Sequence, residues 1–256
     1  MQSASSLAFF ALANLAMLCS AQFPAWPKAI NTTTVSKTIV ITGTVDAKNA
    51  RFIAASNIGN GGQGEGQKAI FLLKKGATLR NAIIGSPAAD GVHCEDSCNI
   101  ESVWWEDVGE DAATFRSTDK NAVFKVTGGG AKEASDKVFQ HNGGGTVYIK
   151  NFQVYNFGKL YKSCGNCKVQ YKRKAVLDTI KATGSGKDIV AINKVYGDQA
   201  QLSNIQVSSA CKVICELFDG NNSGGSKDPT SLKKYLPGQS GDGTYCVYSA
   251  SAVKVV

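Results

Sequence analysis

The chain has 256 residues, of which 43% are hydrophobic and 19% are charged, and its formal net charge is +8. A chain of this length buries a full hydrophobic core without disulfide staples, and no low-complexity linker divides it. After residue 21 no stretch is long and apolar enough for a transmembrane helix, which argues against a membrane-spanning protein.

The first 21 residues predict a secretory signal peptide. They carry no charged side chain, hold a largely apolar run from Leu7 to Leu18, and end in the small-residue site Cys19-Ser20-Ala21. Such a segment is too short to span a membrane. We therefore expect residues 1–21 to be removed and residues 22–256 to form one exported, monomeric domain. For an exported chain, a basic charge without interleaved aromatic residues favours an acidic polysaccharide over nucleic acid as partner, although the charge can also serve solubility alone.

Seven cysteines follow the predicted signal peptide: Cys94, Cys98, Cys164, Cys167, Cys211, Cys215 and Cys246. Export favours disulfides, and six of the seven lie in three close pairs. Cys164-Gly-Asn-Cys167 is also compatible with half of a zinc site or a redox pair, but a single CxxC is a weak zinc pattern. The odd count predicts one free or intermolecular thiol, which the spacing does not identify.

Three segments outside the central region have a pattern of their own. Residues 38–45 alternate as a β-strand does, whereas Asn57 to Gln67 form a Gly-rich loop that is too irregular for a phosphate-binding motif. Asn221 to Tyr245 are polar and rich in Gly, Ser and Lys, so we expect a surface loop before a last strand around residues 246–248.

A repeat begins at Leu79: an apolar residue, two others, and a second apolar residue, usually near an Asn or a small residue. Its copies are Leu79/Ala82, Ile100/Val103, Ile149/Phe152, Leu177/Ile180 and Leu202/Ile205, with Phe124 as a degenerate copy. The first positions lie 21, 24, 25, 28 and 25 residues apart. A period in the twenties with few prolines and almost no helical periodicity is typical of stacked β-solenoid coils. We predict an all-β parallel β-helix; on pattern alone, a β-sandwich is the alternative.

Acidic residues are concentrated between Ala89 and Arg116. They are Asp90, Glu95, Asp96, Glu101, Glu106, Asp107, Glu110 and Asp111, and the only Lys or Arg in the stretch is Arg116 itself. Grouped hard oxygen donors suit Ca²⁺, which takes six to eight of them; a polar turn beside a strand is the alternative. Trp104-Trp105 lies in the same stretch, and we expect one ring in the core and the other at the surface.

The coil period predicts that acids and lysines form one column. Residues one coil apart lie over one another at about 4.8 Å. Asp90 and Asp111 are 21 residues apart, Asp111 and Lys137 are 26 apart, and Lys137 and Lys159 are 22 apart. Each gap is close to one coil, so the acids precede the cations along one face. An ordinary solvated lysine face is the alternative.

Such a column suits β-elimination on a uronic acid polymer. Three carboxylates would hold Ca²⁺: Asp90, Glu110 and Asp111. The bound ion draws charge from a substrate carboxylate, and this acidifies the neighbouring C5 proton. Lys137 can remove that proton only if its pKa falls, and we expect Ca²⁺ and the cations Lys159 and Arg116 to lower it.

Three stretches together resemble the family 3 pectate lyases. They are ADGVHCEDSCNIESVWWEDVGEDAATFR, GGGAKEASDKVFQHNGGGTVYIKNF and GKLYKSCGNC, and they occur in the family's order from about Gly85 to Cys167. The resemblance implies a right-handed parallel β-helix, dependence on Ca²⁺, and cleavage of polygalacturonate by β-elimination. It places the family's calcium carboxylates at Asp90, Glu110 and Asp111, and its catalytic base at Lys137.

The resemblance also implies roles for three further cations. A substrate-binding Lys of the family matches Lys159. The family usually has Arg where Lys162 stands, and an ammonium cannot make the bidentate fork that a guanidinium makes with a carboxylate. Conversely, a basic position that is often Lys in the family is Arg116, which keeps the charge.

Two histidines and two other functions are alternatives to this interpretation. His93 and His141 flank the motifs, and we interpret them as polar residues bonded inside turns, since Lys137 is the better base. A polygalacturonase hydrolyses with paired carboxylates and needs no calcium, so it would leave the lysine column unexplained. A non-catalytic pectin-binding solenoid remains the third possibility.

Overall fold

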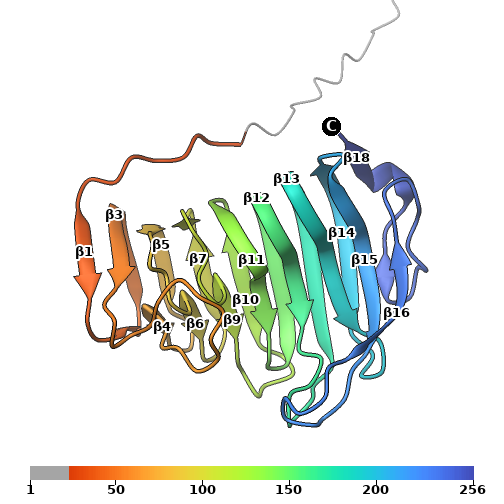
Figure 1. The fold of residues 1–256 in the computed structure, drawn as a ribbon, viewed down its shortest axis with the longest axis horizontal. Helices are drawn as coiled ribbons and strands as arrows, with labels where there is room; N and C mark the ends of the chain where they lie inside the picture. Colours follow the sequence, from red (N-terminus) through yellow and green to blue (C-terminus); the bar gives the residue numbers. More distant parts are fainter. Residues whose placement is uncertain (1–22) are drawn as a thin grey trace, which may run out of the picture.

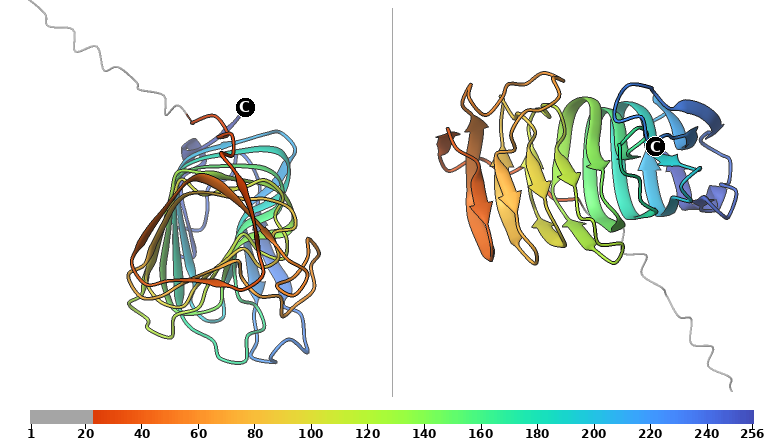
Figure 2. Two further views of the ribbon diagram at one scale, coloured as in Figure 1. Left: turned by 90° about the vertical axis from the view of Figure 1, so that its left-hand side faces the viewer. Right: turned by 90° about the horizontal axis from the view of Figure 1, so that it is seen from below.

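The structure, a computed structural model, describes residues 23–256, so the predicted signal peptide lies outside the described residues. Strands pair in parallel with the coils before and after them, which stacks the coils along one axis (Figure 1). Seen along the stack, each coil has three sides around a packed interior (Figure 2). The predicted parallel β-helix is therefore confirmed.

We call the three sides sheet I, sheet II and sheet III. Sheet I contains β2 (Ile39–Ile41), β4 (Phe71–Leu73), β6 (Val92–Cys94), β9 (Ala113–Phe115) and β15 (Cys211–Asp219). Sheet II contains β7 (Cys98–Glu101), β10 (Val123–Thr127) and β17 (Cys246–Val247). Sheet III contains β1 (Thr32–Val35), β8 (Trp104–Trp105) and β18 (Val253–Val255).

Longer strands bend around the corners and join more than one sheet. From sheet II to sheet III run β3 (Thr44–Ala54), β5 (Thr78–Ile84) and β14 (Gln199–Val207), and from sheet III to sheet I runs β11 (Gly130–His141). All three sheets are crossed by β12 (Gly145–Ser163) and β13 (Arg173–Asn193). The other elements are β16 (Thr230–Tyr235), antiparallel to β15, and the short 3-10 helix η1 (Ala250–Ala252). No helix within residues 23–256 is long and apolar enough to cross a membrane.

The repeat in the sequence marks the corner between sheets II and III. Asn81, Asn151 and Asn204 have φ angles of 53°, 55° and 55°. Asn tolerates this left-handed region better than most L-residues, and one such residue turns the chain sharply. The apolar residues on both sides of the corner can then point inward: Leu79 and Ala82, which flank Asn81, are fully buried.

The prediction that Phe124 marks a repeat copy is wrong by two residues. Val126 pairs with Ile100 of the preceding coil and so holds the repeat position, whereas Phe124 pairs with Cys98. In this coil the corner is made by Gly128 and Gly129, both at positive φ. The copy therefore lacks the polar residue that marks the others.

The ends of the chain differ from the sequence prediction in part. Residues 38–45 form parts of two strands, because the chain bends at Thr42-Gly43 from sheet I to sheet II. The loop predicted over residues 57–67 is confirmed. The segment 221–245, predicted as a surface loop, contains the strand β16. Only Tyr235 of β16 is buried, so its sequence is as polar as that of a loop. The strand predicted at residues 246–248 is present as β17 and is followed by β18.

Both tryptophans of the acidic stretch are buried, so the expected surface ring is not found. Trp105 lies in the core, edge-on to Phe139 with ring centroids 6.1 Å apart. Trp104 is only 4% exposed, and the ring of Trp26 packs on it at 4.8 Å. The N-terminal segment thus covers a ring that the local pattern alone would leave in solvent.

Within the described residues 23–256, three disulfides form and one cysteine remains unpaired. Cys94 bonds Cys98 and Cys164 bonds Cys167, which excludes the zinc alternative for the CxxC motif. The third bond joins Cys215 to Cys246, 31 residues later, and Cys211 is left as a buried thiol. Nearness in sequence therefore does not identify the partner of Cys215, because β17 is brought beside it only by the coil.

Candidate active site

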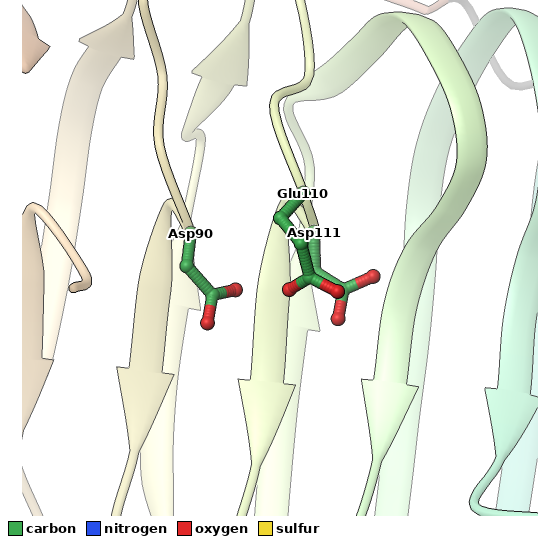
Figure 3. Close-up of side chains that lie close together, drawn as sticks. All are labelled: Asp90, Glu110 and Asp111. Atoms are coloured by element: carbon green, nitrogen blue, oxygen red, sulfur yellow. The ribbon is translucent and has the colours of Figure 1, made fainter. Parts of the chain in front are cut away.

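The predicted acids lie where sheet III turns into sheet I. Asp90 precedes β6, and Glu110 and Asp111 precede β9 one coil later (Figure 3). The two turns approach closely because Gly91 and Gly109 have no side chain: a Cβ on either would lie 2.2 Å from a backbone oxygen of the other turn. The close packing of the turns brings the three carboxylates together.

The register agrees with the predicted column. Val92 pairs with Ala113 and Ala113 with Phe139, which are the offsets that separate Asp90 from Asp111 and Asp111 from Lys137. Lys137 pairs directly with Lys159. Acids and lysines that are distant in the sequence therefore follow one another along the same edge of sheet I.

The acidic cluster of Asp90, Glu110 and Asp111 has the chemistry of a cation site. One oxygen from each carboxylate lies within 4.8 Å of the others, and the residues are 7%, 6% and 2% exposed. Burial, together with the charge of Asp90, raises the pKa of Glu110 to about 7. Burial likewise raises the pKa of Asp111, and Oδ1 of Asp111 is buried without a hydrogen-bond partner. Hard, crowded and incompletely satisfied oxygens fit a hard cation such as Ca²⁺.

Lys137 reaches into this cluster. Its Nζ lies 3.3 Å from Glu110 Oε1, 3.5 Å from Asp111 Oδ1 and 3.3 Å from Asp136 Oδ2. Burial alone would lower the pKa of Lys137, but Asp111, Glu110 and Asp136 outweigh it and raise that pKa above the usual range. The expected fall in the pKa of Lys137 depends on bound Ca²⁺ and stays a prediction; the acids that raise this pKa here are neighbours that the spacing did not reveal.

Asp136 is a functional candidate that sequence reasoning missed. It bridges two lysines: Oδ2 lies beside Lys137, and Oδ1 lies 3.1 Å from Lys159 Nζ. Lys162 belongs to the same group, and its pKa is lowered by burial and then by the charge of Lys159. The available signal was the sequence Ser-Asp-Lys, which places an acid next to the proposed base.

Arg116 reaches the cluster through a histidine. Arg116 donates from Nη1 to His93 Nδ1 at 2.8 Å, and His93 Nε2 lies 2.6 Å from Asp90 Oδ2. Because Arg can only donate, Nδ1 of His93 accepts and Nε2 carries the proton given to Asp90. His93 thus holds Asp90 in place from strand β6, rather than from the turn that we expected. Thr114, which sequence reasoning also missed, lies 3.4 Å from Asp111 Oδ2.

His141 is not part of the site. It is fully buried in β11, where Nδ1 lies 2.8 Å from the hydroxyl of Tyr161 and Nε2 lies 3.1 Å from the carbonyl oxygen of Gly144. Burial and the charge of Arg173 lower the pKa of His141 to about 3. It is a bonded structural residue, as predicted, although it lies in a strand and not in a turn.

The class of protein defined so far is a parallel β-helix with an acidic cluster followed by lysines along one sheet. The family is given by comparison with known proteins. Residues 24–224 match the family model described as pectate lyase. The chain belongs to the pectate lyase family, and the resemblance found in its motifs is confirmed.

Relatives and solved structures agree with this assignment. The chain is 44% identical over 229 residues to pectate lyase E of Emericella nidulans, covering 90% of this chain and 85% of the relative. It is 46% identical over 190 residues to pectate lyase H of the same organism, covering 73% and 69%. The catalytic domain of pectate lyase PelI from Erwinia chrysanthemi superimposes with a TM-score of 0.71 at 28% identity, covering 88% of this chain and all of that domain. PelI in complex with tetragalacturonic acid matches with a TM-score of 0.70 at 30% identity, covering 87% of this chain and 70% of PelI.

Proposed function

We propose that this pectate lyase is secreted, that residues 22–256 are its mature domain after loss of residues 1–21, and that it cleaves polygalacturonate by Ca²⁺-dependent β-elimination. One observation carries the proposal: the buried acidic cluster, in which Asp111 Oδ1 accepts no hydrogen bond, lies in one column with Lys137 and Lys159. Hydrolysis by paired carboxylates would require neither the cation site nor the lysines.

Asp90, Glu110 and Asp111 are the proposed calcium ligands. When bound there, Ca²⁺ supplies Lewis-acid polarisation of a substrate carboxylate. His93 orients Asp90 by its hydrogen bond, and Thr114 contacts Asp111. These neighbours fix the carboxylates in the geometry that the ligand set requires.

Lys137 is the proposed base. It removes the C5 proton of the uronate, the C4–O bond to the leaving sugar breaks, and a double bond forms between C4 and C5. The proton from C5 moves to the amine of Lys137, and the leaving oxygen takes a proton from solvent. Lys137 is suited to this role by position, because its Nζ lies beside both the calcium ligands and Lys159.

Lys159, Lys162 and Arg116 are the proposed substrate-binding cations. Lys159 is held by Asp136 at 3.1 Å, next to the base. Arg116 is exposed and turned towards the cluster by His93. Each can bind and orient a uronate carboxylate, and this places the C5 proton before the base.

The test is ultraviolet absorbance of the unsaturated product released from polygalacturonate, measured with and without a chelator. We expect absorbance to rise with time and the rise to stop when Ca²⁺ is removed. If reducing ends accumulate without absorbance, the reaction is hydrolysis and the proposal is wrong. If no cleavage of any kind occurs, the pectin-binding alternative is favoured.

A further inference from the structure

The Gly-rich loop, which we define as residues 57–68, packs against both turns that carry the proposed calcium ligands. The carbonyl oxygen of Asn60 accepts a hydrogen bond from the Ala89 amide at 2.8 Å. Gln63 donates from Nε2 to the carbonyl oxygen of Gly109 at 2.5 Å. Together these contacts fix the loop beside β4 and β6 (Figure 1). The loop is thus held against the candidate active site by hydrogen bonds.

The loop and the outer face of sheet I border an open cavity of about 750 Å³. Lys37, Asn57 and Lys68 line it on the loop side, and His93 and Arg116 line it where it meets the candidate active site. Since His93 lines the cavity and is hydrogen-bonded to Asp90, the cavity borders the candidate active site on the side of the N-terminal coils.

The cavity is positively charged. Lys37, Lys68 and Arg116 contribute three cations, while the single acid that lines it, Glu95, is engaged by Lys74. Within residues 23–256, neither Lys37 nor Lys68 forms an ion pair: Lys37 is exposed, and Lys68 donates from Nζ only to a carbonyl oxygen, at 3.3 Å. Two ammonium groups therefore face the cavity without a carboxylate partner.

A uronate polymer that follows the column of charges runs along the stack, towards either end. Towards the C-terminal coils the column continues from Lys159 to its register partner Asp188, whose carboxylate repels a uronate. The exposed lysines at that end, Lys187 and Lys212, lie beside the column, one position before Asp188 and its partner Val213. Towards the N-terminal coils the polymer meets the cavity and its cations. The charge pattern therefore favours the cavity as the place that binds a part of the polymer distant from the cleaved bond.

We propose that this cavity is a subsite for a further uronate residue, in which Lys37, from the turn before β2, and Lys68, at the end of the loop, bind the carboxylate, so that longer galacturonan chains are preferred. This inference rests on the proposed function, since it needs an acidic polymer at the adjacent site. Lys37 and Lys68 determine substrate preference and take no part in the elimination itself.

The test compares the wild type with Lys37→Ala, Lys68→Ala and the double variant on trigalacturonate and hexagalacturonate, with product absorbance as the readout. Both lysines are exposed, so we expect all variants to fold, which thermal unfolding checks. For the double variant, kcat/KM on the hexamer should fall about 10-fold through KM, since an exposed ion pair contributes a few-fold in affinity. On the trimer it should stay within about 2-fold of the wild type.

The matched control is Lys187→Ala combined with Lys212→Ala, which removes two exposed lysines from the opposite end of the column. The ratio of hexamer to trimer kcat/KM should not change in this control. A second readout is methylation: the wild type should prefer de-esterified over methyl-esterified polymer more strongly than the double variant does.

An unchanged hexamer-to-trimer ratio in the double variant, or an equal change in the control, would overturn the subsite. A wild type that forms no unsaturated product from any substrate would instead overturn the proposed function. The two failures are therefore distinguishable.

Discussion

Removing the ammonium group of Lys137 separates its structural role from its catalytic role. In the metal-free protein this ammonium is the cation nearest to Glu110 and Asp111, at 3.3 and 3.5 Å. Lys137→Ala leaves these buried carboxylates uncompensated. It also removes the proposed base. We therefore expect two effects that depend differently on Ca²⁺.

The first effect is on stability. Removing one partner of a buried ion pair costs about 3–5 kcal/mol, and here protonation of Glu110, whose pKa is already about 7, reduces the penalty to roughly 3 kcal/mol. For a domain of this size that is a fall in Tm of about 6–12 °C. Saturating Ca²⁺ should restore most of the loss, because it neutralises the same oxygens. Calcium should also bind Lys137→Ala more tightly, since a competing positive charge is gone.

The second effect is on turnover. At saturating Ca²⁺, Lys137→Ala should still bind polygalacturonate yet lose about 10²- to 10⁴-fold in kcat, the contribution typical of a positioned acid or base. Lys137→Arg keeps the charge and so should lose little stability, but its guanidinium is rarely neutral and its turnover should be nearly as poor.

The assays are thermal unfolding with Ca²⁺ or chelator, calorimetric titration of Ca²⁺, and product absorbance. Lys150→Ala is the control, because Lys150 is exposed on sheet II and its ion pair with Asp178 should contribute at most about 1 kcal/mol. Substantial turnover by folded Lys137→Ala would remove this residue as the base and move the role to Lys159 or Arg116. An unchanged Tm in chelator would show that the ion pairs do not stabilise the metal-free site.

Three further outcomes follow from the same contacts. Glu110→Gln removes an anionic ligand, so calorimetry should show weaker Ca²⁺ binding and activity should partly return at high Ca²⁺; wild-type affinity would contradict the assignment. Asp136→Asn frees Lys137 and Lys159 from their shared carboxylate, so kcat/KM should fall about 10-fold, whereas Asp136→Glu should keep part of it; equal loss in both would argue against a positioning role. Because the pKa of His141 is depressed, the unfolded chain binds a proton between about pH 6.5 and pH 3 that the folded chain does not. The free energy of unfolding should therefore decrease as pH falls through this range, by up to about 1.4 kcal/mol per pH unit. His141→Gln should flatten that slope in urea unfolding, and an unchanged slope would exclude His141 as its source.

The fold was predictable because the coil length of a solenoid appears as a period in its sequence. Each coil lies on the next, so equivalent buried positions recur at the coil length, and the left-handed corner adds an Asn beside them. For the same reason the column of Asp90, Asp111, Lys137 and Lys159 followed from spacing alone. Where a coil made its corner from Gly128 and Gly129, the marker disappeared and the assignment of Phe124 failed.

Features that depend on irregular backbone or on distant segments were not predictable. Simple alternation would turn Asp136 and Lys137 to opposite faces, but the register of β11 shifts between Ala134 and Lys137. That irregularity lets both side chains enter the same cluster. The covering of Trp104 by Trp26 depends on where the N-terminal segment runs, which local pattern does not encode.

The charges of the site indicate which cations are paired with its carboxylates and which are not. Asp90, Glu110, Asp111 and Asp136 contribute four carboxylates, and Lys137 and Lys159 contribute the two ammonium groups paired with this set. A divalent cation bound to this set would compensate two of the four carboxylates in place of the Lys137 ammonium, and this favours the neutral amine that the proposed base must be.

Arg116 and Lys162 stand outside this balance. Within residues 23–256 neither forms an ion pair, and Arg116 is engaged only through His93. Of the three proposed substrate-binding cations, these two have no carboxylate of the described residues within ion-pair distance to compete with the substrate. Lys162 has an ammonium where a guanidinium would make two hydrogen bonds to a carboxylate. We therefore expect Lys162 to contribute less to substrate affinity than Arg116 and the cavity beside Arg116.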